Sequence, residues 1–216
     1  MSAACCHSCK GPDPHRGNAS YRRVLWIVLA INASMFAVEI GAGLVAGSAS
    51  LQADALDFLS DAGNYIISLV VLNMAPRYRA LAALTKGLAM GGFGLWVIGA
   101  VVWHALMGTR PEPITMGVVG FAALAANATC FVLLYAFRDG DANMQSVWLC
   151  SRNDVLGNLA VLLAALGVFG TGTGWPDLIV ATIMAGLASQ GAAIVVRQAG
   201  YELRSSGGLW LQNQAR

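Results

Sequence analysis

The stretch ITMGVVGFAALAANATCFVLLYAF, residues 114–137, contains no Asp, Glu, Lys or Arg. A second stretch, LIVATIMAGLASQGAAIVV at residues 178–196, is equally free of charge. A helix needs about 20 consecutive, mostly apolar residues to cross the hydrocarbon core of a bilayer. These two stretches therefore predict a protein that inserts into a membrane.

The composition of the whole chain agrees with a membrane protein. Of its 216 residues, 57% are hydrophobic and 11% are charged, against about 25% charged residues in an ordinary soluble domain. The formal net charge of +2 and the lack of a basic stripe with interleaved aromatic residues argue against a nucleic-acid partner. The five cysteines are an odd number and two of them fall inside apolar stretches, which argues against a disulfide framework.

Charged clusters, glycines and prolines divide the chain into six apolar segments, each long enough to span a membrane. The segments are residues 22–46, 50–75, 79–107, 113–137, 143–170 and 176–202. Because the connections are short, consecutive helices should be antiparallel neighbours. The expected fold is all-α: an integral membrane bundle of six transmembrane helices over residues 22–203, with short tails at 1–21 and 204–216.

Basic residues gather on one side of this expected bundle. They lie at the start of the first helix, between the second and third helices, between the fourth and fifth, and after the sixth, as Arg22, Arg23, Arg77, Arg79, Arg138 and Arg204. The opposite side carries Arg110. Since cytoplasmic loops are enriched in Lys and Arg, both termini are predicted to be cytoplasmic.

Three aspartates interrupt the second apolar segment. Asp54, Asp57 and Asp61 are separated by three and four residues, which places them on one face of a helix with neighbouring side chains about 5–6 Å apart. A charged side chain at the centre of a bilayer costs about 2.5–3.5 kcal/mol on insertion scales. The three carboxylates would repel one another unless they were protonated or bridged by a cation, so they indicate a cation site.

The fifth segment contains a complementary pair, Cys150 and Asp154, which share a helix face at a spacing of four residues. If the second and fifth helices pack together, Asp57, Asp61, Cys150 and Asp154 can converge as four ligands. Oxygen and sulfur ligands in this number suit the tetrahedral preference of Zn²⁺. A soft thiolate also favours zinc or cadmium over Mg²⁺ or Ca²⁺.

Each of these residues also has a structural interpretation. Asp54 lies nearest the start of its segment and suits an interfacial, helix-end carboxylate. The two aspartates that follow it could form an ion pair with Arg152 or remain neutral and hydrogen-bonded. Cys150 could be a small apolar filler, as we expect for Cys130. Glu39, midway along the first segment, could carry protons or accept a structural hydrogen bond.

The stretch GSASLQADALDFLSDAG, residues 47–63, resembles the second-helix signature of the cation diffusion facilitator family. That family carries a His/Asp-x-x-x-Asp pair on helix 2 and a His-x-x-x-Asp pair on helix 5. Asp57 and Asp61 match the first pair, and Asp154 matches the acidic half of the second. The resemblance covers residues 22–203 and implies six helices with cytoplasmic termini.

Further polar positions follow the family pattern, and two features depart from it. Glu39, Asn127 and Asp177 stand where similar polar residues are common in the family. Cys150 occupies the usual His position, which keeps coordination in principle but could shift the metal preference toward softer ions. The cytoplasmic metal-binding domain that commonly follows helix 6 is also missing from the 216 residues, so dimerisation and metal sensing are expected to be absent or to fall to the bundle.

The N-terminal tail contains CCHSC, with Cys5, Cys6, His7 and Cys9. Thiols and an imidazole at this density can capture a soft metal near the membrane. A tail with incidental cysteines fits the same residues equally well. Together with Asp54, these residues form the candidate set of accessory metal ligands.

The resemblance implies a transporter, not an enzyme, that exports Zn, Cd or Co ions in exchange for protons by alternating access. Asp and Cys must lose protons to bind a cation, so metal entry would release protons. No cofactor is expected, since the metal ion is cargo. The expected partners are the metal ion, protons and the lipid bilayer, with a homodimer as an open alternative.

The expected location is the cell (inner) membrane, as a multi-pass protein. Two rival functions stay open. A non-transporting membrane subunit or sensor would bind metal without moving it. An intramembrane aspartyl hydrolase would use two aspartates from different helices, such as Asp61 and Asp154.

Overall fold

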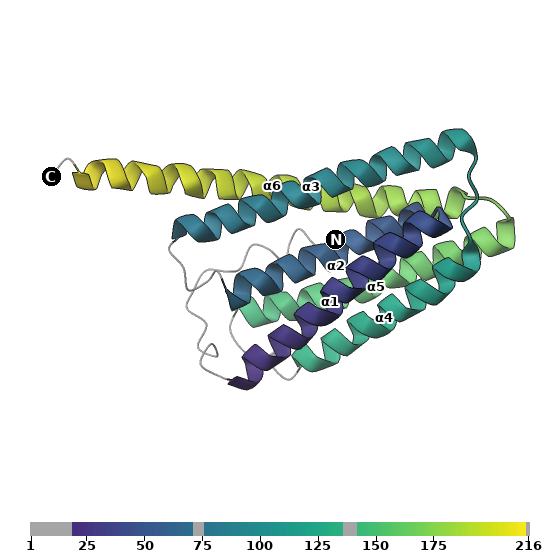
Figure 1. Ribbon diagram of the computed structural model, residues 1–216, viewed down its shortest axis with the longest axis horizontal. Helices are drawn as coiled ribbons and strands as arrows, with labels where there is room; N and C mark the ends of the chain where they lie inside the picture. Colours follow the sequence, from purple (N-terminus) through teal and green to yellow (C-terminus); the bar gives the residue numbers. More distant parts are fainter. Residues whose placement is uncertain (1–18, 71–75, 136–141, 215–216) are drawn as a thin grey trace.

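The computed structural model describes the backbone of residues 19–70, 76–135 and 142–214, and the side chains in these ranges except at 19, 76, 79, 142–153 and 205–214. Figure 1 shows the helices lying side by side as one bundle. They are α1 (Ala19–Ala46), α2 (Ala49–Leu69), α3 (Pro76–Met107), α4 (Pro113–Tyr135), α5 (Ala142–Thr171) and α6 (Trp175–Gln214). Each predicted segment corresponds to one helix, so the all-α architecture is confirmed for the described ranges.

Within the described residues, five of the helices are long and apolar enough to cross a bilayer. The spans are Ser20–Ala46, Ala80–Met107, Pro113–Tyr135, Asp154–Thr171 and Trp175–Arg204. α2 differs because every 18-residue stretch within Ala49–Leu69 contains all three of its aspartates. A sixth span through α2, and the cytoplasmic placement of the termini, stay predictions.

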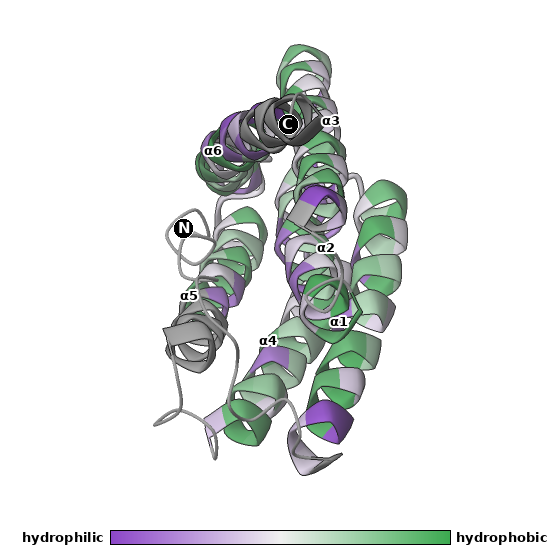
Figure 2. Ribbon diagram, turned by 90° about the vertical axis from the view of Figure 1, so that its left-hand side faces the viewer, coloured by the Kyte–Doolittle hydropathy of each residue, from purple (hydrophilic) through white to green (hydrophobic). Residues whose placement is uncertain are grey.

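The polar helix α2 lies inside the bundle. It contacts α1, α3, α5 and α6, and Figure 2 shows it enclosed between them. Large apolar side chains lie on the outside of the surrounding helices, for example Leu95, Phe121 and Leu163, which are 60–68% exposed. Soluble monomers rarely expose so many large apolar side chains to water. The outer surface therefore suits lipid, and the polar face of α2 is turned inward.

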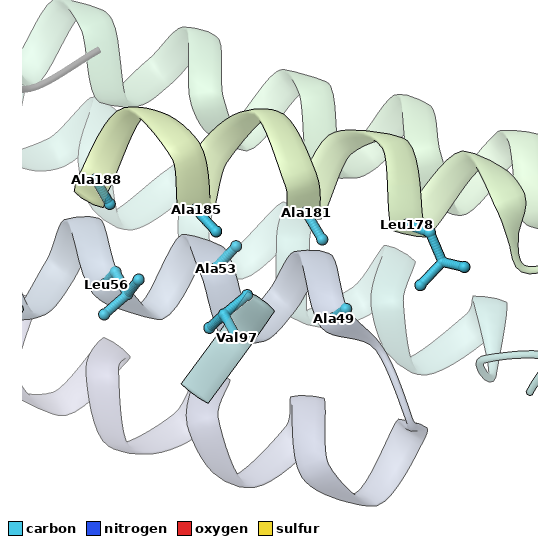
Figure 3. Close-up of a cluster of buried hydrophobic side chains, with 8 residues drawn as sticks. All are labelled: Ala49, Ala53, Leu56, Val97, Leu178, Ala181, Ala185 and Ala188. Carbon is cyan, nitrogen blue, oxygen red and sulfur yellow. The ribbon is translucent and has the colours of Figure 1, made fainter. Parts of the chain in front are cut away.

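Small side chains bring α2 close to α6. Figure 3 shows Ala181, Ala185 and Ala188 in a row along α6, opposite Ala49 and Ala53 of α2. Leu56 and Val97 are buried in the same cluster. Small residues allow helix backbones to approach closely in membrane proteins. This contact holds one side of α2, while its aspartates turn toward α1 and α5.

One buried carboxylate fastens the start of α2 to the start of α6. Asp177, in the first turn of α6, accepts hydrogen bonds from Ser48 Oγ at 2.7 Å, from the Ala49 amide at 2.8 Å and from the Ser50 amide at 3.0 Å. Ser48 Oγ in turn accepts from the Leu51 amide at 3.2 Å, as the N-cap of α2. A carboxylate at a helix N-terminus also interacts favourably with the helix dipole. These bonds fix the position of α2 along the bundle axis relative to α6.

The connections α1–α2, α3–α4 and α5–α6 meet at this same end of the bundle. The Glu112 amide donates to the Ala46 carbonyl at 3.0 Å. A side chain on Gly174 would lie 2.5 Å from the Thr109 carbonyl oxygen, so the α5–α6 connection touches the α3–α4 connection. The order of antiparallel helices then places the start of α1 and the end of α6 toward the opposite end.

Candidate metal site

The three aspartates of α2 line the side of that helix which faces α1 and α5. Asp54 is 1% exposed and Asp61 is 4% exposed, while Asp57 is half-buried. Because an α-helix rises about 1.5 Å per residue, the three carboxyl groups are spread over about 10 Å along the bundle. α2 therefore carries an acidic column, not a single compact group of ligands.

Asp154 meets this column from α5. It is 5% exposed, and its carboxyl group lies within hydrogen-bonding reach of the Asp61 carboxyl group. Its second oxygen, Oδ2, is buried, and no described residue donates a hydrogen bond to it. Two carboxylates at such a distance repel each other unless a proton or a cation lies between them. The junction of Asp61 and Asp154 is thus a place where a positive charge is required.

Gly157 allows α5 to approach the other two aspartates of α2. A Cβ atom at Gly157 would lie 3.6 Å from Asp57 Oδ2 and 3.8 Å from Asp54 Oδ1. Gly157 lies almost one helical turn beyond Asp154, toward the end of the bundle where Asp177 lies. The structure therefore places Asp57, Asp61 and Asp154 on the same interface between α2 and α5.

A complete metal site is not assembled among the described side chains. In that part of the chain, no three His, Cys, Asp or Glu side chains lie close enough together to hold a metal ion. Asp61 and Asp154 meet, and Asp57 lies one turn away along α2. Cys150 belongs to α5 by its backbone, but its side chain lies outside the described residues, as do Cys5, Cys6, His7 and Cys9. The four-ligand set stays a prediction.

Asp54 lies next to an acidic side chain of α1. α2 begins at Ala49, so Asp54 lies in the second turn of the helix, and its side chain is buried. Its interpretation as an interfacial, helix-end carboxylate stays a prediction. Its carboxyl group lies within hydrogen-bonding reach of Glu39 on α1. Glu39 is fully buried, and neither of its oxygens has a hydrogen-bond donor among the described residues. A bond between these two acids exists only when one of them holds a proton, which makes the pair a second place that requires a positive charge.

Two further polar residues near the site were missed by sequence reasoning. Asn158, one turn beyond Asp154 on α5, is fully buried, and neither its Oδ1 nor its Nδ2 has a partner among the described residues. Lys86 of α3 donates to Asn64 Oδ1 on α2 and attracts Asp61 electrostatically. The sequence signals were a spacing of four residues after Asp154 and a lysine inside an apolar segment.

Asp177 and Cys130 have structural contacts. Asp177 holds the start of α2 rather than lining the acidic column. Cys130 is 1% exposed in an apolar cluster with Leu25 and Val28, which confirms the expected packing role, and it accepts from Asn32 Nδ2 at 3.5 Å. Asn127 is 4% exposed in α4.

Residues 25–204 match the family model described as the cation efflux transmembrane domain. The chain belongs to the cation efflux family. This match confirms the resemblance to the cation diffusion facilitators, and it covers almost the same residues as the motifs predicted. Together with the five apolar spans, it identifies a multi-pass membrane protein.

Curated relatives of this cation efflux protein are similar over most of the chain. The cadmium, cobalt and zinc/H(+)-K(+) antiporter of Bacillus velezensis is 23% identical over 89% of the chain and 64% of the relative. The zinc transporter ZitB of Escherichia coli is 27% identical over 77% and 57%. The metal cation efflux system protein CzcD of Cupriavidus metallidurans is 24% identical over 75% and 55%. The chain thus spans 55–64% of the length of these relatives.

Proposed function

We propose that this cation efflux protein exports a divalent transition-metal ion, Zn, Cd or Co, in exchange for protons by alternating access. The contact between the carboxyl groups of Asp61 and Asp154 carries this proposal. It joins two helices at a buried position inside a bundle whose outer surface is apolar. Asp57 and Cys150 complete the proposed set of metal ligands, each one turn from a member of this pair.

The exchange of metal for protons follows from the chemistry of the pair. Two buried carboxyl groups in contact cannot both stay bare, so the site alternates between holding a proton and holding a cation. A divalent ion needs deprotonated ligands and expels the proton when it enters. A proton that arrives from the other side of the membrane weakens the grip on the metal. Protons and the metal ion therefore compete for the same site.

The relatives support the class of cargo. Their names mention zinc in ZitB and cadmium, cobalt and zinc in the antiporter, and the same ions suit a site with oxygen ligands and one thiolate. The proton coupling rests on the carboxyl pair and on the antiporter's name. The homodimer and the cell (inner) membrane stay predictions.

The contact of Asp61 with Asp154 also suits the rival intramembrane aspartyl hydrolase, which needs two acids from different helices. Such an enzyme would require neither Asp57 nor Cys150, and its activity would not depend on a transported metal. A metal sensor would use the same ligands but would hold the ion. The three functions therefore differ in whether metal crosses the membrane.

Metal flux into proteoliposomes tests the proposal. Zn²⁺ and Cd²⁺ uptake under an imposed pH gradient is compared between the intact chain, Asp154→Asn and Cys150→His. Asp154→Asn should abolish flux because it removes one carboxylate of the pair without changing its size. Cys150→His should retain flux and change the ratio of Zn²⁺ to Cd²⁺ transport.

Glu202→Gln provides the matched control, because it neutralises an exposed carboxylate on α6, away from the site. Glu202 Oε1 accepts a hydrogen bond from Gln198 Nε2 at 3.3 Å. It should transport like the intact chain. Correctly inserted intact protein that binds Zn²⁺ but shows no flux under either gradient direction would move the assignment to a sensor. Flux that survives Asp154→Asn unchanged would refute the role of the carboxyl pair.

A further inference from the structure

Lys86 is the one Lys or Arg within the apolar span Ala80–Met107 of α3. It lies six residues inside the span, about 9 Å from its start, and its side chain is half-buried. A charged residue within a membrane segment needs a partner or a function. A lysine near the end of a span commonly extends along its own helix toward the interface.

Lys86 instead crosses onto α2. A Cβ atom at Gly63 would lie 3.2 Å from Lys86 Cγ and 3.2 Å from Lys86 Cδ, so the aliphatic stem of the lysine lies against the backbone of α2 at a position without a side chain. The ammonium group then donates a hydrogen bond to Asn64 Oδ1. Gly63 provides the space for the stem and Asn64 anchors the charge.

This anchor lies beside the proposed metal site. Asn64 follows Asp61 by three residues, which places the two side chains on the same face of α2 and about 5–6 Å apart. The Lys86 charge attracts Asp61 electrostatically. Asp61 in turn is the residue of α2 that meets Asp154. A fixed positive charge therefore lies one side chain away from the pair that requires a cation, on the side nearer the end of α2.

We propose that Lys86 is a tethered counter-cation of the metal site, which lowers the affinity of the site for a divalent ion and so allows the ion to leave. The inference rests on the proposed transport function. Its observations are the path of the lysine stem over Gly63, the bond to Asn64 and the position of Asn64 next to Asp61. Lys86 lies beside the site through its bond to Asn64 and takes no part as a ligand.

The physical consequence depends on ion charge. Repulsion by a fixed unit charge is proportional to the charge of the approaching ion and is strong in a site that contains little water. A divalent ion brings two positive charges into the site, and each proton that it expels removes one. Loading that expels fewer than two protons raises the charge beside Lys86, and Lys86 then opposes loading and favours unloading. Lys86 would thus weaken metal binding and speed up metal release, which raises the transport rate.

The test measures Zn²⁺ transport by the full chain in proteoliposomes together with Zn²⁺ binding in detergent by calorimetry. Lys86→Met keeps the length of the stem and removes the charge. It should tighten the Zn²⁺ dissociation constant by about tenfold, lower the KM by a similar factor and lower the maximal rate. Lys86→Arg, which restores the charge, should bring the dissociation constant and KM back toward those of the intact chain.

Asn64→Ala keeps the charge but removes its anchor, and should change affinity in the same direction as Lys86→Met by a smaller factor. It keeps the inference testable if Lys86→Met does not fold. The same variants in a chain with Cys5, Cys6 and Cys9 replaced by Ser separate binding by the tail from binding by the site.

Equal or weaker Zn²⁺ binding in Lys86→Met, or equal tightening in Lys86→Arg, would overturn the inference, because charge would then not set the affinity. An intact chain that transports Zn²⁺ while Lys86→Met behaves identically refutes the role of Lys86 alone. An intact chain without Zn²⁺ flux refutes the proposed function instead. The two failures are therefore distinguishable in one set of measurements.

Discussion

Replacing Asp177 should loosen α2 without altering the metal ligands. The Asp177 carboxylate is 1% exposed and accepts three hydrogen bonds, from Ser48 Oγ and from the amides of Ala49 and Ser50, at 2.7–3.0 Å. Asp177→Ala leaves all three donors without their acceptor in a buried place. Asp177→Asn keeps one oxygen and directs an NH₂ group against the donors. We expect Ala to be the more damaging change and Asn to lie between it and the intact chain.

The size of the effect follows from these bonds. A hydrogen bond to a charged group contributes about 1.5–3 kcal/mol, and bonds that share one acceptor do not add fully. A loss of about 3–6 kcal/mol is therefore expected for Asp177→Ala. For a chain of this length, 1 kcal/mol corresponds to about 2–4 °C in the melting temperature. The midpoint should fall by roughly 10 °C or more.

Tryptophan fluorescence during heating of the detergent-solubilised protein measures this midpoint. Glu202→Gln is again the control, and it should melt with the intact chain. Zn²⁺ binding at a temperature where Asp177→Asn is still folded should be unchanged, because Asp177 does not face the acidic column. Unchanged melting in Asp177→Ala, or a loss of Zn²⁺ binding in folded Asp177→Asn, would refute the assignment of Asp177 to the anchoring of α2.

Three further predictions concern the space around the site and the helix ends. Gly157→Ala should keep transport, because its Cβ would meet Asp57 Oδ2 and Met184 Cε at an ordinary contact distance of 3.6 Å. Gly157→Val should block Zn²⁺ flux and binding by placing methyl groups among the carboxylates. Gly170→Val on the same helix is the control and should transport normally, because nothing lies within 4 Å of its Cβ. Equal flux in the two Val variants would contradict this prediction. Gly87→Ala should lower the melting temperature, because its Cβ would lie 2.8 Å from Val196 Cγ2 of α6 and overpacking costs about 1–3 kcal/mol. Gly99→Ala on the same helix, in open space, should leave the melting temperature unchanged or raise it. Equal melting temperatures in the two variants would show that α3 and α6 can move apart without cost. The pKa of Glu112 is lowered by hydrogen bonds from Thr115 and from the Ile114 amide, so Glu112 should stabilise the start of α4 above its ordinary pKa and lose that effect as the pH falls through the lowered value; melting of Glu112→Gln and the intact chain should differ at pH 7 and converge in acid.

Much of the fold could be predicted from the sequence because membrane insertion depends on composition. The segments predicted to end at 46 and 107 and to begin at 113 agree with helices that end at Ala46 and Met107 and begin at Pro113. Hydropathy was less informative where a helix continues beyond its apolar part. The last segment was expected to end at 202, whereas α6 continues to Gln214, because helical backbone can extend into a polar stretch.

The partners of the buried acids could not be predicted in the same way. A spacing of three and four residues places Asp54, Asp57 and Asp61 on one face, but it does not determine which neighbouring helix each one meets. The structure pairs Asp54 with Glu39 of α1 and Asp61 with Asp154 of α5. These pairings depend on the rotation of α2, which the small residues along α6 and the Asp177 anchor determine from outside the motif.

The position of α2 explains why a helix with three acids is stable in this bundle. It is the helix that lipid could accommodate least, and it contacts four neighbours. Enclosure removes the acids from lipid but also from water, so their charge must be balanced within the bundle by protons, by a metal ion or by Lys86. The ammonium group of Lys86 is permanently attached, whereas protons and metal ions can leave. Because Lys86 balances part of the negative charge of the site, a mobile proton or metal ion is attracted less strongly. The enclosure of α2 therefore creates the need for a cation, and Lys86 keeps the metal ion from being bound too tightly to be released.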